Sequence, residues 1–553
     1  MATAPDSVVV VGDVLLDRDL DGTVTRLCPD APVPVLDDPT EYPRPGGAGL
    51  AALLAAWDGF DVTLVTALGK GPVAERLRAL LAPHVRLVEL PRDGEPAEKT
   101  RLLADGRALL RVDRPGRGAV GPASSGVRAA FAQAAAILVS DYGGGVTGTP
   151  AVRDAIALRA GRVPVVWDPH PRGSEPVPGT RVVTPNLGEA AKAAGVSPPS
   201  RGPGLLREVA RLAGELRERW DAGAVCVTLG AGGAVLSRGA EPFTVPAPPV
   251  RTGDPCGAGD RFAASVCGLL AAGRTMPEAV EGAVHAAADF LAAGGVSRVG
   301  HLLAEACAAD GPPSAAAHGT RPASARRHGH ADPGTADSAK SAGRSPRKPV
   351  RFDAVAPRDP APGNGGKDSP GRPSAPIAVG TAGRGPNAGR RAETTASVAA
   401  GPAVDALELV RRARARGGTI VATGGCFDLL HAGHIRTLQA ARALGDFLVV
   451  CLNSDASVRA LKGPPRPFHS AEDRAEVLRA LACVDAVAVF EEETPERLIG
   501  TLRPHVWVKG GDYAAEALPE AALVASLGGQ VVTVPYLAGR STTRIARVAA
   551  DGG

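Results

Sequence analysis

Two histidines in the C-terminal part of the chain have the spacing and surroundings of a phosphate-binding site. His431 and His434 close the segment GGCFDLLHAGH, which begins at Gly424 directly after an apolar run and leads into a helical pattern. A helix that starts there offers unpaired backbone N–H groups and the positive end of its dipole to an anion. Gly433 between the histidines lets a phosphate approach the backbone. A metal site is the alternative, but no HExxH pattern or nearby carboxylate completes a zinc ligand set.

A second glycine-rich segment indicates phosphoryl transfer in the N-terminal part. Gly257, Ala258, Gly259 and Asp260 precede the Ala-rich helical run 263–272. At a helix start, these backbone amides can form an anion hole for a transferring phosphoryl group. Asp260 would accept the proton of the attacking hydroxyl. The alternative is a plain helix entry capped by an aspartate. The chain has no GxxxxGK[ST] segment, which argues against a P-loop enzyme.

Alternating apolar runs place both segments at the ends of strands in an α/β fold. Strands and amphipathic stretches such as 204–219 alternate, which is typical of mostly parallel sheets. A second, Rossmann-like domain restarts the pattern at about residue 404. The expected strands are 8–11, 63–66, 136–140, 164–167, 181–184 and 224–228, then 419–423, 447–452, 486–490, 506–508 and 531–534. The expected C-terminal helices are 405–416, 435–444, 471–481, 495–502 and 542–548.

Two further segments depart from this alternation. Short strands near 23–36 and 98–113, with a turn at Asp105 and Gly106, predict a small β lid outside the main sheet. Residues 301–403 are rich in Pro, Gly, Ala, Ser and Arg, so they cannot bury enough apolar surface to offset the entropy of ordering. We expect a disordered linker there, between domains at 1–300 and 404–553.

The composition excludes several classes of protein. With 62 Lys and Arg against 58 Asp and Glu, the formal net charge is only +4, which gives no general case for nucleic acid or a membrane as a partner. The eight cysteines are spread singly, as in reduced cytosolic proteins rather than disulfide or zinc frameworks. The sequence has neither a signal-peptide pattern nor an apolar run of membrane-spanning length. We therefore expect a cytoplasmic protein.

The C-terminal domain resembles the nucleotidyltransferases with the signature HxGH, over residues 419–548. Besides the histidines, the match includes NSD at 453–455, LKG at 461–463, VKGGDY at 508–513 and RSTTRI at 540–545. In this order the segments are similar to the adenylyltransferase half of the bacterial bifunctional heptose kinase/adenylyltransferases. They are less similar to glycerol-3-phosphate or choline-phosphate cytidylyltransferases, although the core motif is shared.

This resemblance implies in-line attack of a sugar 1-phosphate on the α-phosphorus of ATP, with pyrophosphate leaving and Mg²⁺ as a charge bridge. His431 and His434 would hold the triphosphate, and Lys462 would add a mobile cation. Asp428 would orient the ligand or its loop, or form an Asx turn. Further nucleotide and phosphate contacts are implied for Gly425, Phe427, Lys509, Ser541, Thr542, Thr543 and Arg544.

The N-terminal domain resembles the ribokinase-like (PfkB-type) sugar kinases over residues 8–300. The matching segments are VGDVLLD at 11–17, RPGGAG at 44–49, SDYG at 140–143, DP at 168–169, TPNLGE at 184–189 and VTLG at 227–230. Carboxylates suit the hydroxyl donors of a sugar. The implied roles are proton acceptance for Asp260, sugar binding for Asp13 and Asp17, a flexible turn near the sugar for Gly46 and Gly47, and organisation of Mg²⁺ and the ATP phosphates for Asn186 and Glu189.

The stretch LCPDAPVPV at 27–35 resembles the segment after the first strand of the heptose kinases. The resemblance implies phosphorylation of D-glycero-β-D-manno-heptose 7-phosphate at its anomeric hydroxyl, removal of the 7-phosphate by a separate phosphatase, and synthesis of ADP-heptose. Lys99, Arg101 and Arg111 are candidates for contacting the 7-phosphate, with solvated hairpin charges as the alternative. We expect sugar phosphates and ATP as partners, a homodimer, and neither nucleic acid nor membrane.

Two positions depart from the kinase pattern. Leu50 lies where the family usually has Asn after the Gly-rich turn, and Arg261 follows the proposed base where Thr is common. A lost Asn removes a hydrogen-bond partner of the sugar, and such sites are sensitive to one loss. Two alternatives therefore stay open. One is a different sugar kinase fused to a cytidylyltransferase, and the other is a degenerate kinase domain that regulates the transferase.

Overall fold

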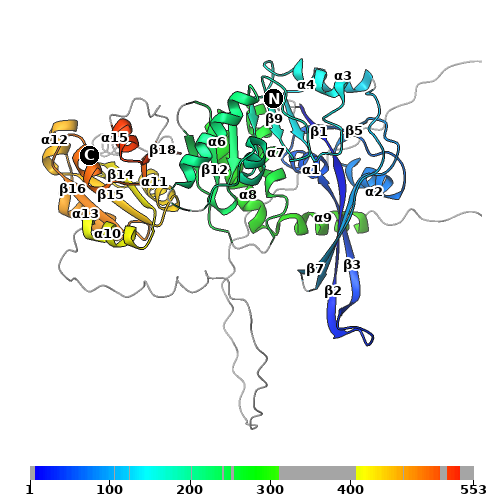
Figure 1. Ribbon diagram of the computed structural model, residues 1–553, viewed down its shortest axis with the longest axis horizontal. Coiled ribbons are helices and arrows are strands. Elements are labelled where there is room, and N and C mark those ends of the chain that lie inside the picture. Colours follow the sequence, from blue (N-terminus) through cyan, green and yellow to red (C-terminus); the bar gives the residue numbers. More distant parts are fainter. Residues whose placement is uncertain are drawn as a thin grey trace, which may run out of the picture.

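The structure is a computed structural model that describes residues 7–104, 106–123, 125–200, 202, 204–239, 242–250, 254–309, 406–464, 466–510 and 520–535. The described elements form two α/β units, one within 7–309 and one within 406–535 (Figure 1). The expected linker lies outside the described residues from residue 310 onward. Helix α9 (Gly295–Ala309) continues past the boundary expected at residue 300.

The N-terminal unit is built on a mostly parallel sheet. Its strands follow the order β5-β4-β1-β8-β9-β10-β11-β12-β13, and β12 is antiparallel to both β11 and β13. The central strands are almost wholly buried and rich in Val, as expected for a sheet covered on both faces. The bounds are β1 (Ser7–Gly12), β4 (Asp61–Thr66), β5 (Arg86–Glu89), β8 (Ala136–Ser140), β9 (Val165–Asp168), β10 (Val182–Val183), β11 (Val225–Thr228), β12 (Ala234–Ser237) and β13 (Pro242–Val245).

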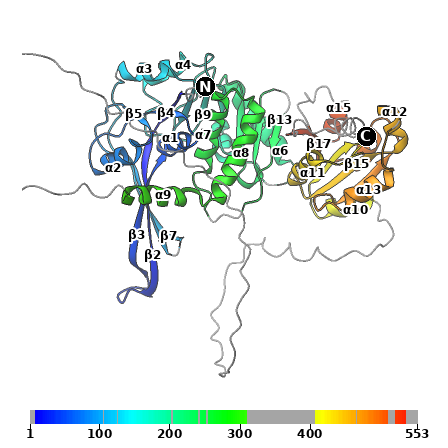
Figure 2. The same cartoon turned by 180° about the vertical axis from the view of Figure 1, so that it is seen from behind.

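Helices cover both faces of this sheet, and each face has its own hydrophobic core. Helices α1, α2, α7, α8 and α9 pack on one face, and α7 and α8 lie side by side in front of the sheet in Figure 2. Helices α3 to α6 pack on the other face. The bounds are α1 (Ala48–Trp57), α2 (Pro72–Leu81), α3 (Ser125–Ala132), α4 (Pro150–Ala157), α5 (Leu187–Ala194), α6 (Leu205–Arg219), α7 (Ala258–Ala271) and α8 (Met276–Ala292).

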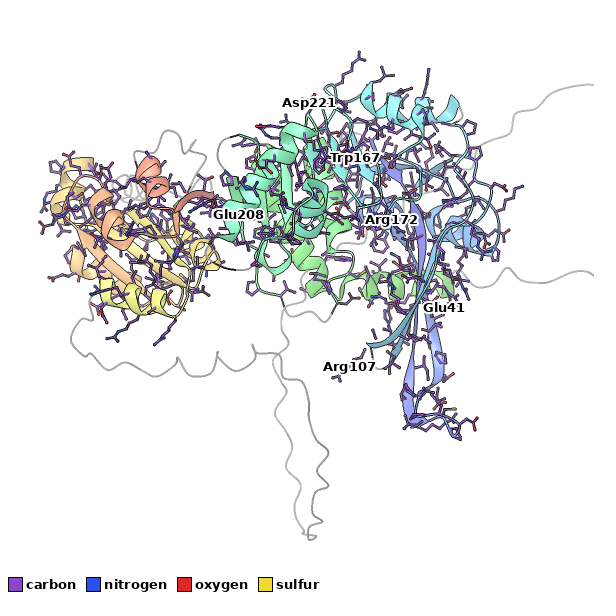
Figure 3. The ribbon with its side chains drawn as sticks, in the orientation of Figure 1. Glu41, Arg107, Trp167, Arg172, Glu208 and Asp221 are labelled. Atoms are coloured by element: carbon purple, nitrogen blue, oxygen red, sulfur yellow. The ribbon has the colours of Figure 1, made fainter. Side chains whose placement is uncertain are left out.

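A second, four-stranded sheet confirms the expected β lid. Its order is β3-β2-β6-β7, formed by β2 (Val14–Leu27), β3 (Pro34–Gly47), β6 (Glu98–Ala104) and β7 (Arg107–Arg114). The sheet projects from the body of the N-terminal unit (Figure 1), and Figure 3 labels Glu41 and Arg107 on it. The strands β2 and β3 are longer than the sequence indicated, because they run from the sugar-kinase motifs at their inner ends to the exposed tip.

The C-terminal unit is a five-stranded parallel sheet in the order β16-β15-β14-β17-β18, with apolar cores on both faces. This confirms the expected Rossmann-like arrangement. The strands are β14 (Ile420–Gly425), β15 (Phe447–Asn453), β16 (Ala486–Phe490), β17 (Val506–Gly510) and β18 (Gln530–Val534). The helices are α10 (Ala406–Ala415), α11 (Ala432–Ala443), α12 (Asp455–Lys462), α13 (Ala471–Arg479), α14 (Glu496–Leu502) and α15 (Glu520–Ser526).

The Gly-rich segment 44–49 is not the flexible turn that the sequence indicated. Strand β3 runs to Gly47 and helix α1 begins at Ala48 without an intervening loop. Arg44 is 1% exposed, and its guanidinium pairs with the buried carboxylate of Asp19 at 2.7 Å. The left-handed backbone of Gly47, with φ of 58°, makes the direct change from strand to helix possible.

The main sheet of the N-terminal unit and the sheet of the C-terminal unit meet at their edges, where Phe243 of β13 pairs in parallel with Thr533 of β18. Leu206 of α6 also packs against the core of the C-terminal unit. Within the described ranges, no helix combines the length and apolar character needed to cross a membrane. The seven cysteines described by the structure are free thiols.

Candidate active sites

The end of β1 lies so close to β8 that only glycine fits at Gly12. A Cβ atom there would come within 1.8 Å of the Ser140 carbonyl oxygen. This approach brings Asp13 to the loop after β8, where its carboxylate accepts three backbone N–H bonds of 2.7 to 3.1 Å. The donors are Tyr142, Gly144 and Val146. Asp13 therefore fixes this loop, and its contact with a sugar stays a prediction.

Asp260 lies in the first turn of α7, behind Gly257, whose φ of 77° requires the left-handed region. The amides of Ala258 and Gly259 are thus at the helix N-terminus, as the sequence predicted. Asp260 is 7% exposed, and the Tyr142 hydroxyl donates a 2.9 Å hydrogen bond to its Oδ1. Burial raises the pKa of Asp260 to about 7, although this hydrogen bond lowers it. A carboxyl of this kind suits a general base at neutral pH.

Two lid residues complete the surroundings of Asp260. Asp17 of β2 raises the pKa of Asp260, and Lys99 of β6 lowers it, so both side chains lie within electrostatic reach of the base. A Cβ atom on Gly46 would lie 2.6 Å from Asp17 Oδ2, so this glycine lets the carboxylate pack against β3. The structure thus brings together four of the predicted kinase residues, namely Asp260 of α7 and Asp17, Lys99 and Gly46 of the lid.

The lid arginines have other partners. Arg101 pairs with Asp19 at 2.9 Å and with Asp254 at 2.6 Å, just before the glycine-rich segment. Arg111 pairs with Asp113 on the exposed strand β7. Arg101 therefore connects the lid to the loop before α7. Lys99 remains the better candidate for a sugar phosphate, because no ion pair within the described part of the chain involves it.

Asn186 and Glu189 form a capping box at the start of α5. The Glu189 N–H donates to Asn186 Oδ1 at 3.0 Å, and the Asn186 N–H donates to Glu189 Oε2 at 2.9 Å. Burial raises the pKa of Glu189. Asp168 at the end of β9 has a pKa raised well above its usual value by burial, then by Asp260 and Glu189. These carboxylates therefore lie close enough to repel one another.

The two departures from the kinase pattern have structural explanations. Leu50 is 2% exposed in α1, and its Cδ2 atom would lie 3.1 Å from a Cβ on Gly257. Leu50 thus packs beneath the start of α7 as a core residue. Arg261 pairs with Asp58 at 2.7 Å, which ties α7 to the end of α1.

The C-terminal histidines occupy the start of α11. His431 is the N-cap residue, and its Nδ1 accepts a 3.2 Å hydrogen bond from the Gly433 N–H. The rings of His431 and His434 stack with centroids 3.9 Å apart. Burial, together with the nearby His431 and Lys462, lowers the pKa of His434 to about 4. His434 Nδ1 is buried without a partner among the described residues.

The loop between β14 and α11 is shaped around these rings. Phe427 adopts φ of 43°, and its ring lies 5.4 Å from that of His434. A Cβ atom on Gly425 would lie 3.1 Å from the Phe427 ring, so the glycine allows this packing. Lys462 is the exposed last residue of α12, a helix that the sequence analysis missed.

Asp428 holds a neighbouring loop rather than forming an Asx turn. Its carboxylate is 2.6 Å from the Arg466 guanidinium and accepts N–H bonds from Phe468 and His469. Both Asp428 and Arg466 are largely buried. The loop that follows the LKG motif is thereby fixed against the histidine loop. Of the alternatives open from the sequence, orientation of the loop is the one observed.

Lys509 and the C-terminal motif give less support to the predicted phosphate contacts. Lys509 Nζ lies 3.0 Å from the buried carboxylate of Glu520 and 5.8 Å from the Trp507 ring centroid. A phosphate would therefore have to compete with Glu520 for this cation. Residues 511–519, and the predicted contacts Ser541, Thr542, Thr543 and Arg544, lie outside the described residues.

Arg474 of α13 is a site-organising residue that the sequence did not reveal. It is 2% exposed, and its guanidinium donates to four groups around the histidine loop. The acceptors are the carbonyl oxygens of Cys426, Asn453 and His469 and the carboxylate of Asp455, at 2.6 to 3.0 Å. The ends of β14 and β15 and the start of α12 are thus tied to one cation.

Replacing Arg474 by Met is expected to destabilise the C-terminal unit by about 3 kcal/mol, because buried acceptors lose their donor. Urea denaturation of the full chain measures this loss. Arg479→Met is the matched control, since Arg479 is exposed near the end of the same helix. An Arg474→Met protein as stable as the control would contradict this role.

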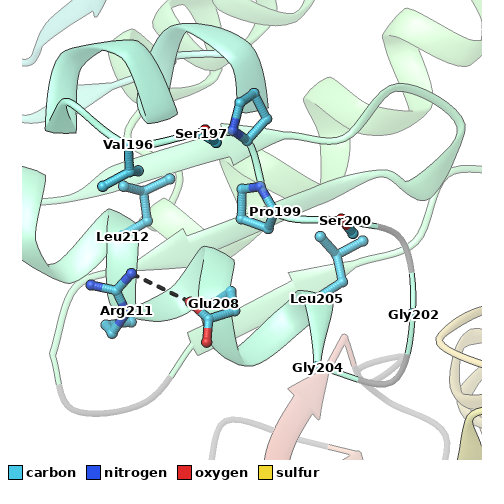
Figure 4. Close-up of a pocket in the computed structure, with 11 residues that line it drawn as sticks. Val196, Ser197, Pro199, Ser200, Gly202, Gly204, Leu205, Glu208, Arg211 and Leu212 are labelled. Carbon is cyan, nitrogen blue, oxygen red and sulfur yellow. Dashed lines mark hydrogen bonds and ion pairs between the residues drawn. The ribbon is translucent and has the colours of Figure 1, made fainter.

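A surface pocket of about 520 Å³ lies between the loop after α5 and helix α6 (Figure 4). Glu208 and Arg211 form a 3.3 Å ion pair in its wall, and Leu205 and Leu212 supply apolar surface. None of the described candidate residues lines this pocket. It is therefore separate from both sites.

Comparisons with known proteins agree with this division. A family model described as "pfkB family carbohydrate kinase" matches residues 5–298, and one described as "Cytidylyltransferase-like" matches residues 422–547. The bifunctional protein HldE of Streptomyces coelicolor is 48% identical over 98% of this chain and 96% of its own length. The bifunctional protein HldE of Pelobacter propionicus is 32% identical over 97% of this chain and 94% of its own length.

Among solved structures, a ribokinase from Arabidopsis thaliana complexed with ribose and ATP aligns with 52% of this chain and 93% of its own chain. The identity is 20% and the TM-score is 0.40. The kinase match and the transferase match lie on the two sides of the expected linker, and each contains one of the two candidate sites. The chain is thus an enzyme with a carbohydrate kinase domain and a nucleotidyltransferase domain.

Proposed function

The chain belongs to the family of bifunctional HldE proteins, and from this premise we propose that it makes ADP-heptose. Its kinase phosphorylates D-glycero-β-D-manno-heptose 7-phosphate at O1, and its transferase converts heptose 1-phosphate and ATP into ADP-heptose and pyrophosphate. A separate phosphatase removes the 7-phosphate between these steps. The observation that supports this proposal best is that one chain holds two sites. One is a buried base, Asp260, hydrogen-bonded to Tyr142, and the other is a pair of stacked histidines at a helix N-terminus.

In the kinase step, Asp260 takes the proton of the anomeric hydroxyl while that oxygen attacks the γ-phosphorus of ATP. The amides of Ala258 and Gly259 at the start of α7 stabilise the negative charge on the transferring group. Asp17 binds sugar hydroxyls, and Lys99 neutralises the sugar phosphate. Their place beside Asp260 supports this assignment.

Mg²⁺ fits the kinase site at the Glu189 carboxylate. Burial raises the pKa of Glu189, so a cation beside it would stabilise the charged form. Asn186 holds Glu189 in place through the capping box. When bound, the ion neutralises charge on the phosphates of ATP.

In the transferase step, His431 and His434 bind the triphosphate and stabilise charge on the departing pyrophosphate. The neutral His434 ring offers a polar contact to the triphosphate without the cost of burying a cation. Asp428 and Arg474 keep the loops in place. Gly425, Phe427 and the motif that contains Ser541, Thr542, Thr543 and Arg544 are proposed to complete the ATP site.

The kinase half of the proposal is tested by ADP release from the full chain with ATP and heptose 7-phosphate. Phosphorus NMR of the product identifies the phosphorylated hydroxyl. We expect a new phosphate ester at the anomeric carbon. Turnover of another sugar phosphate in preference to the heptose would overturn the proposed substrate while leaving the kinase assignment intact.

A cytidylyltransferase is the second candidate for the C-terminal domain. The match to a family model described as cytidylyltransferase-like favours it. The order of the segments NSD, LKG, VKGGDY and RSTTRI supports the adenylyltransferase instead. The two candidates differ in the nucleotide that they consume, so a comparison of ATP with CTP separates them.

We place both reactions in the cytoplasm, where ATP is supplied. A formal net charge of only +4 on 553 residues supports small-molecule partners rather than nucleic acid or a membrane. Free cysteines, several of them buried, fit a reducing compartment.

The lid supports a homodimer. All of the side chains of β7 are exposed, and Leu109, Leu110 and Val112 are 45%, 59% and 41% exposed. Apolar side chains on an edge strand favour pairing with another chain. Leu110→Glu is expected to convert the dimer to a monomer in sedimentation velocity. Leu158→Glu is the control, because Leu158 is 67% exposed outside the lid. A monomeric wild type would contradict this proposal.

A further inference from the structure

Tyr142 joins the loop after β8 to the proposed base of the kinase. Its hydroxyl donates to Asp260 Oδ1 at 2.9 Å, across a sequence separation of 118 residues. Its backbone N–H donates to Asp13 Oδ2 at 3.1 Å. Because Asp13 also binds the next turns of this loop, the position of the hydroxyl is set by a buried carboxylate and not by an unsupported loop.

The Tyr142 ring is fixed on its other sides as well. The His170 ring lies nearly parallel to it, with centroids 5.9 Å apart and an interplanar angle of 22°. Lys99 Nζ lies 6.0 Å from its centroid. A Cβ atom on Gly47 would lie 3.1 Å from the ring, so the ring packs directly on the backbone at the start of α1. A ring held in this way gives its hydroxyl one direction.

We propose that Tyr142 is the positioning residue of the kinase, and that its hydroxyl holds Asp260 Oδ1 so that Oδ2 faces the attacking sugar hydroxyl. This role rests on the proposed kinase reaction. In that reaction the proton of the sugar hydroxyl moves to Asp260 Oδ2 and a bond forms between the sugar oxygen and the γ-phosphorus. The bond from the γ-phosphorus to the β–γ bridging oxygen breaks, and ADP leaves with its electron pair.

The charges around this pair determine the sign of the expected effect. Asp260 faces Asp17 and Lys99 from the lid and Asp168 from β9, while the Cys256 thiol faces Tyr142. Burial raises the Tyr142 pKa well above its usual value, so the hydroxyl stays protonated and remains a donor. The hydrogen bond lowers the pKa of Asp260, and its loss therefore raises that pKa. The base then needs a higher pH to become active.

The test is the pH profile of kcat/KM for the Tyr142→Phe chain, followed by ADP release. The acid limb is expected to move up by about one pH unit, so that the rate falls by about fivefold near neutral pH and by about tenfold well below it. At high pH part of the loss should remain, because Asp260 is ionised there but is no longer held in place by the hydroxyl, and the KM for ATP should change little. Tyr42→Phe is the matched control, since the ring of Tyr42 packs against His301 and not against a site residue.

Site-specific 3-fluorotyrosine at position 142 provides a second variant that keeps the ring and the hydroxyl. Its more acidic hydroxyl is a stronger donor, so the acid limb should move to lower pH. Limbs that stay at the wild-type pH in both variants would overturn the role of Tyr142, and so would a loss of rate that is equal at every pH. The acceptor is whichever sugar phosphate the wild type turns over, so rejection of heptose alone bears only on the proposed substrate. Absence of ADP release with every acceptor would overturn the kinase reaction and this role together.

Discussion

Replacing Asp260 by Asn is expected to lower the kinase turnover number by about 10²- to 10⁴-fold, the range that a positioned general base contributes. The amide has the same shape as the carboxylate but cannot take up the proton of the sugar hydroxyl. Tyr142 can still donate to the oxygen in the place of Oδ1, so the site should keep its geometry. ADP release at saturating ATP and sugar phosphate measures the effect.

The pH dependence of the wild type provides a further check on the same residue. Burial raises the pKa of Asp260 to about 7, and a base must be unprotonated to act. The value of kcat/KM should therefore rise as the pH increases through about 7 and then level off. Asp260→Asn should lack this limb.

Two controls separate a loss of chemistry from a loss of fold in Asp260→Asn. Adenylyl transfer by the same preparation should be unchanged, because its histidines lie in the other domain. Asp289→Asn makes the same chemical change at an exposed position of α8 and should leave both activities intact. A kinase rate equal to the wild type in Asp260→Asn would show that another group accepts the proton, or that no base is needed.

Replacing His434 by Ala is expected to lower adenylyl transfer by about 10²- to 10³-fold, the loss typical when one donor to developing charge is removed. Its buried Nδ1 has no partner in the described part of the chain, and its ring stacks on His431. Both observations fit an atom that binds a triphosphate. Pyrophosphate release measures the effect, and ADP release by the kinase should be retained.

The low pKa of His434 adds a prediction about pH. Burial lowers this pKa to about 4, so the free ring is neutral and does not titrate between about pH 5 and 8. Titration of His434 should therefore not weaken the binding of ATP to the wild type across this pH range. The matched control for His434→Ala is His285→Ala, which makes the same change at an exposed position of α8. Unchanged adenylyl transfer in His434→Ala would remove this histidine from the mechanism.

Most strands of the main sheets and both glycine-rich sites could be predicted because their signals are local, whereas β5, β12 and β13 were not among the expected strands. An apolar run of four to seven residues followed by glycines is visible in the sequence, as at β14 and the segment before His431. Asp260 and His434 were found in this way. The start of α11 came three residues earlier than expected, because His431 caps the helix with its own side chain.

The positioning residues could not be predicted because their partners are distant in the sequence. Tyr142 and Asp260 are 118 residues apart, and Arg101 and Asp254 are 153 residues apart. Arg474 lies in the helix expected at 471–481, and only the fold places it among four acceptors. Exposed and buried charges look alike in a sequence, so the lid cations could not be sorted in advance.

The most direct test of the whole account is pyrophosphate release from the full chain with heptose 1-phosphate, comparing ATP with CTP. We expect release with ATP, formation of ADP-heptose, and little release with CTP. Release with CTP alone, or only with a different sugar or polyol phosphate, would contradict the ADP-heptose assignment while leaving a nucleotidyltransferase in place.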